Sequence, residues 1–415
     1  MKFEMWIFSV LSLCFLSCSS ITNKQIKNES GKKYLLKNYT KRLNKDRHFY
    51  SLGRFDYHKR KDSSYERRKD FWQYRDRFSI GPDTQSYTQP VYLEDKDQVL
   101  LSIIGKGLSL RDLKTGAEIW TYEIALGVAA RALVKDDFVY FAALDGVLRK
   151  VQLADAKLVW EKDLKTPSFG AIIDIGHSIV LTASDNSVWA INPSDASVNW
   201  RYRRPAGSKG FKWVLREDSY PLTVLDGKMI SVGFSDGFFV ALQGINGATA
   251  WEQDFNKSGK FQDSDWKHQV FDGGSKILLT LSEGNTVILD AASGNVLKRF
   301  KGPSFSSSIK DVESADIYQS LSDKSLVKKT PQGNVLWMKD LREFGHVSQM
   351  VSMNKDRLAV LTNSYGLLLL NSATGEILDD DFLGEGLVSE LGFDGKRLFF
   401  LGPYNSFHSY NVKLN

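Results

Sequence analysis

Cysteine is nearly absent from this chain of 415 residues, which contains only Cys14 and Cys18. Both lie near the start, so disulfides and redox-active thiol pairs are excluded from all of the sequence that follows. The six histidines are scattered without the spacing of zinc ligands, and glycine-rich phosphate loops and nucleophile elbows are missing. The sequence therefore favours a binding protein, and we expect no catalytic residue, no metal and no cofactor.

A tryptophan-containing pattern recurs along most of the chain. In its first copy, from Lys114 to Glu123, a turn containing Gly116 is followed four residues later by Trp120 in a β-rich run. The same slot falls at positions 120, 160, 200, 251, 298, 337 and 379, with Lys and Asp in place of Trp at 298 and 379. Successive slots are 39 to 51 residues apart. In a β-rich sequence, a period in this range is typical of propeller blades.

Short β-rich runs separated by tight turns precede each slot. Before Trp160, for example, Phe138–Ala142 and Val147–Val151 flank an Asp-Gly turn. Such runs predict antiparallel strands joined by hairpins. Each unit then forms a small sheet, which must stack on its neighbours to bury both of its faces.

The two ends of the repeat region complement each other. Trp72 matches the slot 48 residues before Trp120, whereas Arg397–Leu401 and Ser406–Val412 are strands with no slot after them. We therefore predict an all-β fold over residues 71–415: an eight-bladed β-propeller of four-stranded antiparallel blades, closed by pairing of N-terminal and C-terminal strands. The large aromatic side chains of the slots should pack between adjacent blades. They are Trp72, Trp120, Trp160, Trp200, Trp251 and Trp337.

Residues 1–17 have the pattern of a bacterial lipoprotein signal peptide. The apolar run from Met5 to Leu16 is too short to span a bilayer, and Phe15-Leu-Ser-Cys18 resembles a lipobox, in which Cys18 would be lipidated. Cys14 fits a lipobox less well, because the residue before the cysteine should be small. An ordinary signal peptide is the alternative. Serines rather than Asp after Cys18 suggest the outer membrane, by the sorting rule of such lipoproteins.

Residues 18–70 differ in composition from the rest of the chain. The stretch 20–70 contains 16 Lys or Arg and 6 Asp or Glu, a net charge of +10, although the whole chain carries only +6. Because residues 1–19 contribute no net charge, residues 71–415 carry −4. We expect a basic, largely disordered tether, either simply solvated or attracted to anionic lipid headgroups or lipopolysaccharide. Nucleic acid is an implausible partner for an exported lipoprotein.

Two spacings are long because extra sequence follows Trp200 and Trp251, at residues 203–221 and 256–268. Links between consecutive blades emerge on one face of a propeller, so these two loops should be neighbours. Large apolar side chains beside charged ones on exposed loops favour a protein-docking patch. The candidate docking residues are Trp213, Leu215, Arg216, Asp263 and Asp265.

Other interpretations of these loops stay open. Trp213 and Trp266 are alternatively side chains that fold back to cap the ring. Asp263 and Asp265 with His268 form a possible hard-metal site, although one short cluster on a loop favours it only weakly.

The glycine and tryptophan of the repeat resemble those of quinoprotein dehydrogenases. That resemblance implies a quinone held against a disulfide of adjacent cysteines, with a calcium ion beside it. Residues 71–415 contain no cysteine. A quinone-dependent enzyme is therefore the least favoured interpretation.

The two loop motifs make a second resemblance more specific. Trp213-Val-Leu215-Arg216 with Ser219 and Pro221, and Asp263-Ser-Asp265, resemble the docking motifs of the BamB family, although Trp213 stands where that family usually has Leu. The resemblance implies a non-catalytic lipoprotein on the periplasmic face of the outer membrane, docked on the POTRA domains of the barrel subunit of the β-barrel assembly machine. The main alternative is a propeller lipoprotein that binds another envelope protein or a polysaccharide.

Overall fold

The structure is a computed structural model and describes a set of ranges between residues 72 and 412. They are 88–204, 221–234, 236–255, 268–281, 285–300, 306, 308–354, 356–383, 389–402 and 406–412, together with the backbone of 72–79. All of these residues belong to one compact unit, Asp62–Asn415.

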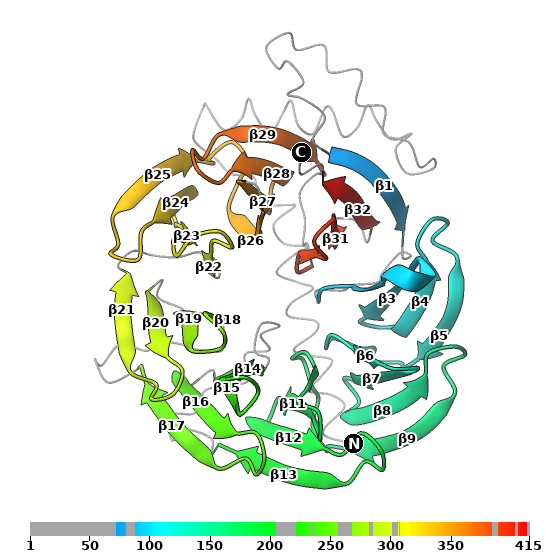
Figure 1. The fold of residues 1–415 in the computed structure, drawn as a ribbon. Coiled ribbons are helices and arrows are strands. Elements are labelled where there is room, and N and C mark those ends of the chain that lie inside the picture. Colours follow the sequence, from blue (N-terminus) through cyan, green and yellow to red (C-terminus); the bar gives the residue numbers. More distant parts are fainter. Residues whose placement is uncertain are drawn as a thin grey trace, which may run out of the picture. The chain divides into compact units, whose positions relative to one another are not determined.

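Eight four-stranded antiparallel sheets form a ring (Figure 1). Each sheet is one blade. In the seven blades made of consecutive strands, the first strand lies near the centre of the ring and the last strand on the rim. This arrangement confirms the predicted eight-bladed propeller. Among the described residues, no helix is long and apolar enough to cross a membrane.

The blades are numbered here along the chain, with the sheet that contains both ends of the fold as blade 1. The strands of blades 1 to 4 are β1 (Trp72–Ser79), β30 (Gly392–Phe393), β31 (Arg397–Gly402) and β32 (Ser406–Val412); β2 (Val91–Leu93), β3 (Gln98–Ile103), β4 (Gly107–Asp112) and β5 (Glu118–Glu123); β6 (Leu133–Lys135), β7 (Phe138–Ala142), β8 (Val147–Gln152) and β9 (Leu158–Asp163); β10 (Ile173–Asp174), β11 (Ile179–Ala183), β12 (Ser187–Ile191) and β13 (Val198–Arg203). One short 3-10 turn, η3 (Glu94–Lys96), joins β2 to β3.

Blades 5 to 8 repeat the same plan. Their strands are β14 (Leu222–Val224), β15 (Met229–Gly233), β16 (Phe238–Gln243) and β17 (Thr249–Asp254); β18 (Gln269–Phe271), β19 (Lys276–Thr280), β20 (Thr286–Asp290) and β21 (Val296–Phe300); β22 (Ile309–Lys310), β23 (Ile317–Ser320), β24 (Ser325–Lys329) and β25 (Val335–Asp340); β26 (Val347–Met353), β27 (Arg357–Thr362), β28 (Gly366–Asn371) and β29 (Ile377–Phe382).

Burial explains why the middle strands of a blade are continuous apolar runs. Every residue of β11 and of β12 is buried, because a neighbouring blade covers each face of the sheet. The rim strand β9 instead has only exposed and half-buried residues. Hairpin turns contain residues that tolerate positive φ, such as Gly146 at φ 81°. In the same turn, the carboxylate of Asp145 accepts a hydrogen bond from the Val147 amide.

The ring closes through strands from opposite ends of the chain. Strand β1 pairs antiparallel with β32, from Trp72 opposite Val412 to Ser79 opposite Ser406. The prediction that the terminal segments share one blade is therefore confirmed. The rim strand of that blade comes from the N-terminal end and the three others from the C-terminal end.

Candidate docking site

The tryptophans of the repeat bond across the junctions between blades. For each repeat tryptophan whose side chain is described, the indole N–H donates to a backbone carbonyl just after the third strand of the following blade, at 2.8 to 3.2 Å. The pairs are Trp120 with Leu153, Trp160 with Pro193, Trp200 with Gly244, Trp251 with Ala291 and Trp337 with Ser372. Trp72 begins β1, and the structure describes only its backbone.

The glycine of the repeat belongs to the same junction. Gly247 has φ +69°, and a Cβ built on it would lie 2.4 Å from Cε3 of Trp200 in the preceding blade. Gly294 faces Trp251 and Gly375 faces Trp337 in the same way. At these three junctions, the glycine of one unit therefore packs on the tryptophan of the unit before it.

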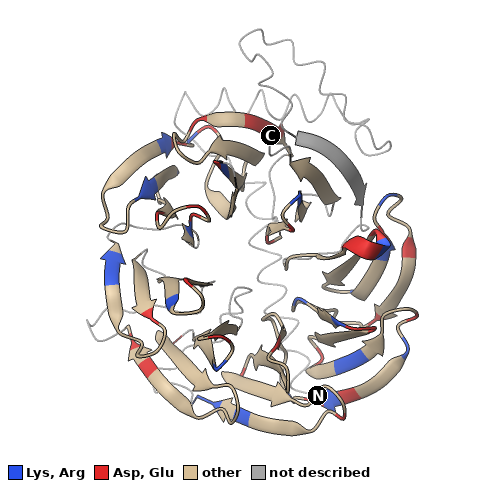
Figure 2. Cartoon of the chain, in the orientation of Figure 1, with Lys and Arg blue, Asp and Glu red and all other residues tan. Residues whose placement is uncertain are grey.

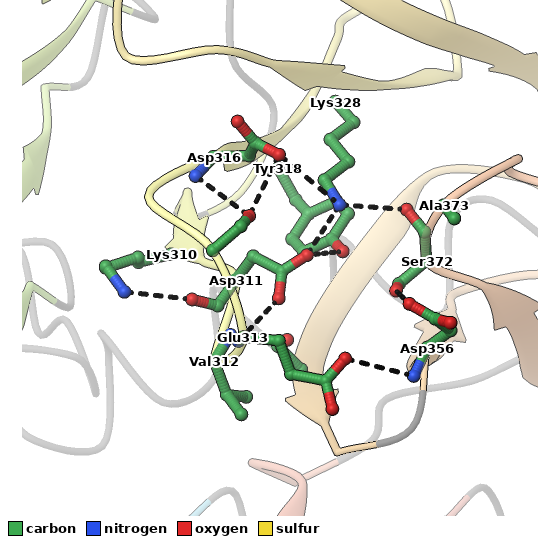
Figure 3. A network of polar contacts seen from close by, with 12 residues as sticks. Lys310, Asp311, Val312, Glu313, Asp316, Tyr318, Lys328, Asp356, Ser372 and Ala373 are labelled. Atoms are coloured by element: carbon green, nitrogen blue, oxygen red, sulfur yellow. Dashed lines mark hydrogen bonds and ion pairs between the residues drawn. The ribbon is translucent and has the colours of Figure 1, made fainter.

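A buried polar network joins blades 7 and 8 (Figure 3). The Lys328 ammonium lies 2.6 Å from Oδ2 of Asp311 and donates to the Ser372 carbonyl of blade 8 at 3.1 Å. The Tyr318 hydroxyl donates to the same Asp311 oxygen at 2.5 Å. The Lys328 and Asp311 side chains are 8% and 3% exposed. This charge pair is thus almost entirely removed from water.

The pKa values of the network follow from its contacts. Burial by itself would raise the pKa of Asp311, but hydrogen bonds from Lys328 and Tyr318 outweigh it and hold that pKa below its usual value. Burial and the neighbouring Asp311 raise the pKa of Tyr318. Asp311 is therefore a carboxylate and Tyr318 a neutral phenol at neutral pH.

The proposed docking residues and the lipidation site fall outside the described residues. These residues are Cys18, Trp213, Leu215, Arg216, Asp263 and Asp265, and the placement of their side chains stays a prediction. The structure does describe both ends of the two links that carry the docking residues. One link leads from β13 to β14 and the other from β17 to β18. Since β14 contacts β18, the two links end side by side on adjacent blades.

Arg204, the residue directly after β13, holds the start of the first link against blade 5. Arg204 donates from Nε to Asp236 at 2.6 Å and from Nη1 to Glu252 at 3.1 Å, and both acceptors belong to blade 5. Its guanidinium carbon lies 3.5 Å from the centroid of the Phe238 ring. Arg204 thus ties the start of the link to the blade that follows, and sequence reasoning did not single it out.

His268, at the end of the second link, is a core residue. Its Nε2 lies 2.8 Å from the Ser231 hydroxyl, and its ring packs edge-on against Phe239 at 4.9 Å between centroids. Burial lowers the pKa of His268 to about 3. Among the residues described, no three His, Cys, Asp or Glu side chains converge on a possible metal position.

The ends of both links border one hollow. A depression of about 530 Å³ runs along β14 and β18 and the turns after them. Thr223, Asp226 and Gln269 contribute polar side chains to its wall, beside the buried His268. The Gln269 side-chain oxygen is already engaged, because it accepts from the Lys310 amide at 2.7 Å.

The low pKa of His268 makes a pH-dependent contribution to stability. As the pH falls from 7 to 5, the unfolded chain binds a proton at this histidine and the folded chain does not. The free energy of unfolding therefore decreases by about 2 kcal/mol. The His268→Gln variant lacks this loss. We expect the urea midpoint of the wild type to fall toward that of the variant as the pH is lowered. A constant difference between the two midpoints from pH 7 to 5 would contradict the assignment.

Comparison with known proteins places this fold in a family. A family model described as outer membrane protein assembly factor BamB matches residues 106–326, a little over half of the chain. The chain belongs to the BamB family. The matched range includes residues 205–220 and 256–267 of the two links.

Individual relatives are distant. A BamB protein from Legionella pneumophila (strain Paris) is 22% identical over 125 residues, which cover 28% of this chain and 32% of the relative. The chain thus spans about a third of the length of the curated relative it matches. The crystal structure of BamB from Moraxella catarrhalis has a TM-score of 0.68 at 16% identity, covering 82% of this chain and all of the other.

Two quinohemoprotein alcohol dehydrogenases share the fold. The enzyme from Pseudomonas putida HK5 has a TM-score of 0.63 at 11% identity, covering 82% of this chain and 76% of its own. The enzyme from Comamonas testosteroni has a TM-score of 0.66 at 13% identity, and the match covers 83% of this chain and 77% of the enzyme chain. At such identities, these structures, like that of the Moraxella BamB, show a common architecture and nothing of its chemistry.

Proposed function

We propose that this protein is a non-catalytic scaffold that docks on the outer-membrane β-barrel assembly machinery and supports insertion of outer-membrane proteins. The observation that carries the proposal is the BamB family match over 106–326, because it includes the two links in which the docking motifs lie. The described ends of these links support it further, since they sit on neighbouring blades, as one continuous docking surface requires.

Each docking residue has a distinct role in this proposal. Trp213 and Leu215 are the apolar anchors, and Arg216 is the polar anchor beside them. Asp263 and Asp265 on the second link pair with cations or backbone donors of the partner. The partner is the barrel subunit, bound through its POTRA domains.

The N-terminal region attaches this scaffold to the membrane in our proposal. Cys18 carries the lipid after removal of residues 1–17, and the basic tether to residue 70 separates the propeller from the inner leaflet of the outer membrane. Several acyl chains on one cysteine suffice for stable anchoring, at about 0.8 kcal/mol for each buried CH₂. The protein then faces the periplasm.

Affinity purification from detergent-solubilised envelopes tests the proposal. The Leu215→Glu/Arg216→Glu variant should lose an outer-membrane barrel protein with POTRA domains that the wild type recovers. Truncation of a central anchor typically costs about 2 kcal/mol or more, which is at least about 30-fold in affinity. The matched control is Leu297→Glu/Arg299→Glu on β21, where Leu297 is 53% exposed and lies on the rim of another blade.

The outcomes separate role from site. If wild type and docking variant recover the barrel protein equally, the role stands and the docking residues are wrong. If a different envelope protein or a polysaccharide is recovered, the alternative lipoprotein function replaces this one. A rise in melting temperature on adding pyrroloquinoline quinone and calcium would instead favour the quinone-dependent enzyme, because a ligand of the folded state stabilises it by mass action.

A further inference from the structure

The rim strand of blade 4 reverses the charge found on the blades beside it. One residue after the tryptophan slot, blades 3 and 5 carry Glu161 and Glu252, whereas blade 4 carries Arg201. Three residues after the slot, the acids of those blades are Asp163 and Asp254, whereas blade 4 has Arg203. The strand register confirms that these positions are equivalent. Asp163, Arg203 and Asp254 each pair with the first residue of the preceding strand, which is Val147, Ser187 and Phe238 respectively.

One carboxylate serves both of these arginines. Arg201 Nη2 lies 2.9 Å from Oδ2 of Asp185, and Arg203 Nε lies 3.4 Å from the same oxygen. The other oxygen of Asp185 accepts from the backbone and the hydroxyl of Ser187. Two guanidinium groups facing one carboxylate leave an excess positive charge on this edge of the blade (Figure 2).

That excess charge is presented mainly by Arg203. The Arg201 guanidinium carbon lies 4.1 Å from the centroid of the Trp189 ring, and its side chain is 36% exposed. The Arg203 side chain is 63% exposed. Two residues along a strand span about 7 Å, so the two guanidiniums can face two carboxylates on one partner surface.

The position of this edge connects it to the first link. The link begins immediately after Arg203, and its first residue, Arg204, bonds to Asp236 and Glu252 of blade 5. Residues 199–216 contain six Lys or Arg and no Asp or Glu. The positive edge of β13 is therefore the described beginning of a cationic stretch that extends to Arg216.

We propose that Arg201 and Arg203 form the positively charged margin of the docking surface and recognise carboxylates on an acidic face of the partner protein. This inference rests on the proposed function. A protein surface is favoured over a lipid surface because the proposed docking residues Trp213 and Leu215 belong to the same link, and large apolar side chains are typical anchors of protein interfaces. Charges at the margin of an interface act chiefly on the association rate and its salt dependence.

The test compares association rates of the full-length, detergent-solubilised protein with the POTRA domains of the barrel subunit from the same organism. Arg203→Glu should slow association by roughly tenfold at low salt, with a smaller difference at high salt. Asp185→Asn should accelerate association, because it frees both guanidiniums while its amide oxygen still accepts from Ser187. The control is Arg342→Glu on blade 7, which makes the same charge change at a side chain that is 76% exposed.

Each outcome decides the inference. Opposite shifts for Arg203→Glu and Asp185→Asn, with Arg342→Glu unchanged and all melting temperatures preserved, support it. If Arg203→Glu behaves like the control while Leu215→Glu/Arg216→Glu abolishes binding, the margin is wrong and the proposed function stands. If the wild type does not bind the POTRA domains, both fail. If Arg203→Glu weakens only binding to vesicles containing anionic phospholipid, the surface recognises lipid and the inference is overturned.

Discussion

Replacing Lys328 by methionine should lower the free energy of unfolding by about 3–5 kcal/mol, because it leaves the buried Asp311 carboxylate without its cation. The methionine keeps most of the aliphatic volume, so the loss reports the ammonium and not a cavity. Asp311 retains the Tyr318 hydroxyl at 2.5 Å and the Glu313 amide at 2.9 Å, which compensate only in part. The measurement is the shift in the midpoint of urea denaturation.

Blade 3 supplies the matched control. Lys150 faces Trp160 across the sheet as Lys328 faces Trp337, and it donates to the Pro193 carbonyl at 3.0 Å. Its ammonium lies 4.0 Å from the centroid of the Phe138 ring. Since Lys150→Met removes one hydrogen bond to a carbonyl that keeps its bond from Trp160, we expect a loss of about 1 kcal/mol. Equal losses at the two lysines would show that the Asp311 pair is not the cause.

Truncating Trp200 to alanine should cost about 3–5 kcal/mol, as expected when a large buried aromatic side chain leaves a cavity. The ring is 7% exposed and packs between blades 4 and 5, where it also faces Gly247. Its removal therefore loosens the junction between blades 4 and 5, which the first link spans. Urea denaturation of the purified variant measures the loss.

A phenylalanine at the same position separates packing from hydrogen bonding. Trp200→Phe keeps most of the buried ring but loses the indole N–H that donates to Gly244 at 2.8 Å. We expect this variant to lose about 1–2 kcal/mol, less than half of the alanine effect. If both variants lose the same amount, the stabilisation comes from the hydrogen bond, and the packing argument is wrong.

Much of the fold was predictable because each blade repeats the same pattern of apolar strands separated by turn residues. Apolar runs between turn residues located strands closely: Phe138–Ala142 and Ser406–Val412 are the bounds of β7 and β32. The unmatched ends of the repeat also revealed the closing blade. The sequence showed glycine and tryptophan as one local motif, but their contact lies between consecutive units, which a linear pattern does not show.

The sequence did not predict which side chains contact one another when a loop separates them along the chain. Lys328 stands in a strand next to Lys329, and only the structure brings it to Asp311 in the turn after β22. His268 was weighed as a metal ligand beside Asp263 and Asp265, because sequence does not reveal that its ring is buried against Phe239 and Ser231. The docking residues stay predictions, since neither link is among the described residues.

Pairing of β1 with β32 sets the order in which this domain can be completed. Blades 2 to 8 each consist of consecutive strands, so each has its hairpins as soon as that part of the chain has been synthesised. Blade 1 joins the first strand to the last three, and contacts of such long sequence separation form slowly. Until Ser406–Val412 has emerged, β1 lacks the neighbour to which it bonds. The open ring meanwhile exposes unpaired strand edges, and such edges are prone to aggregation.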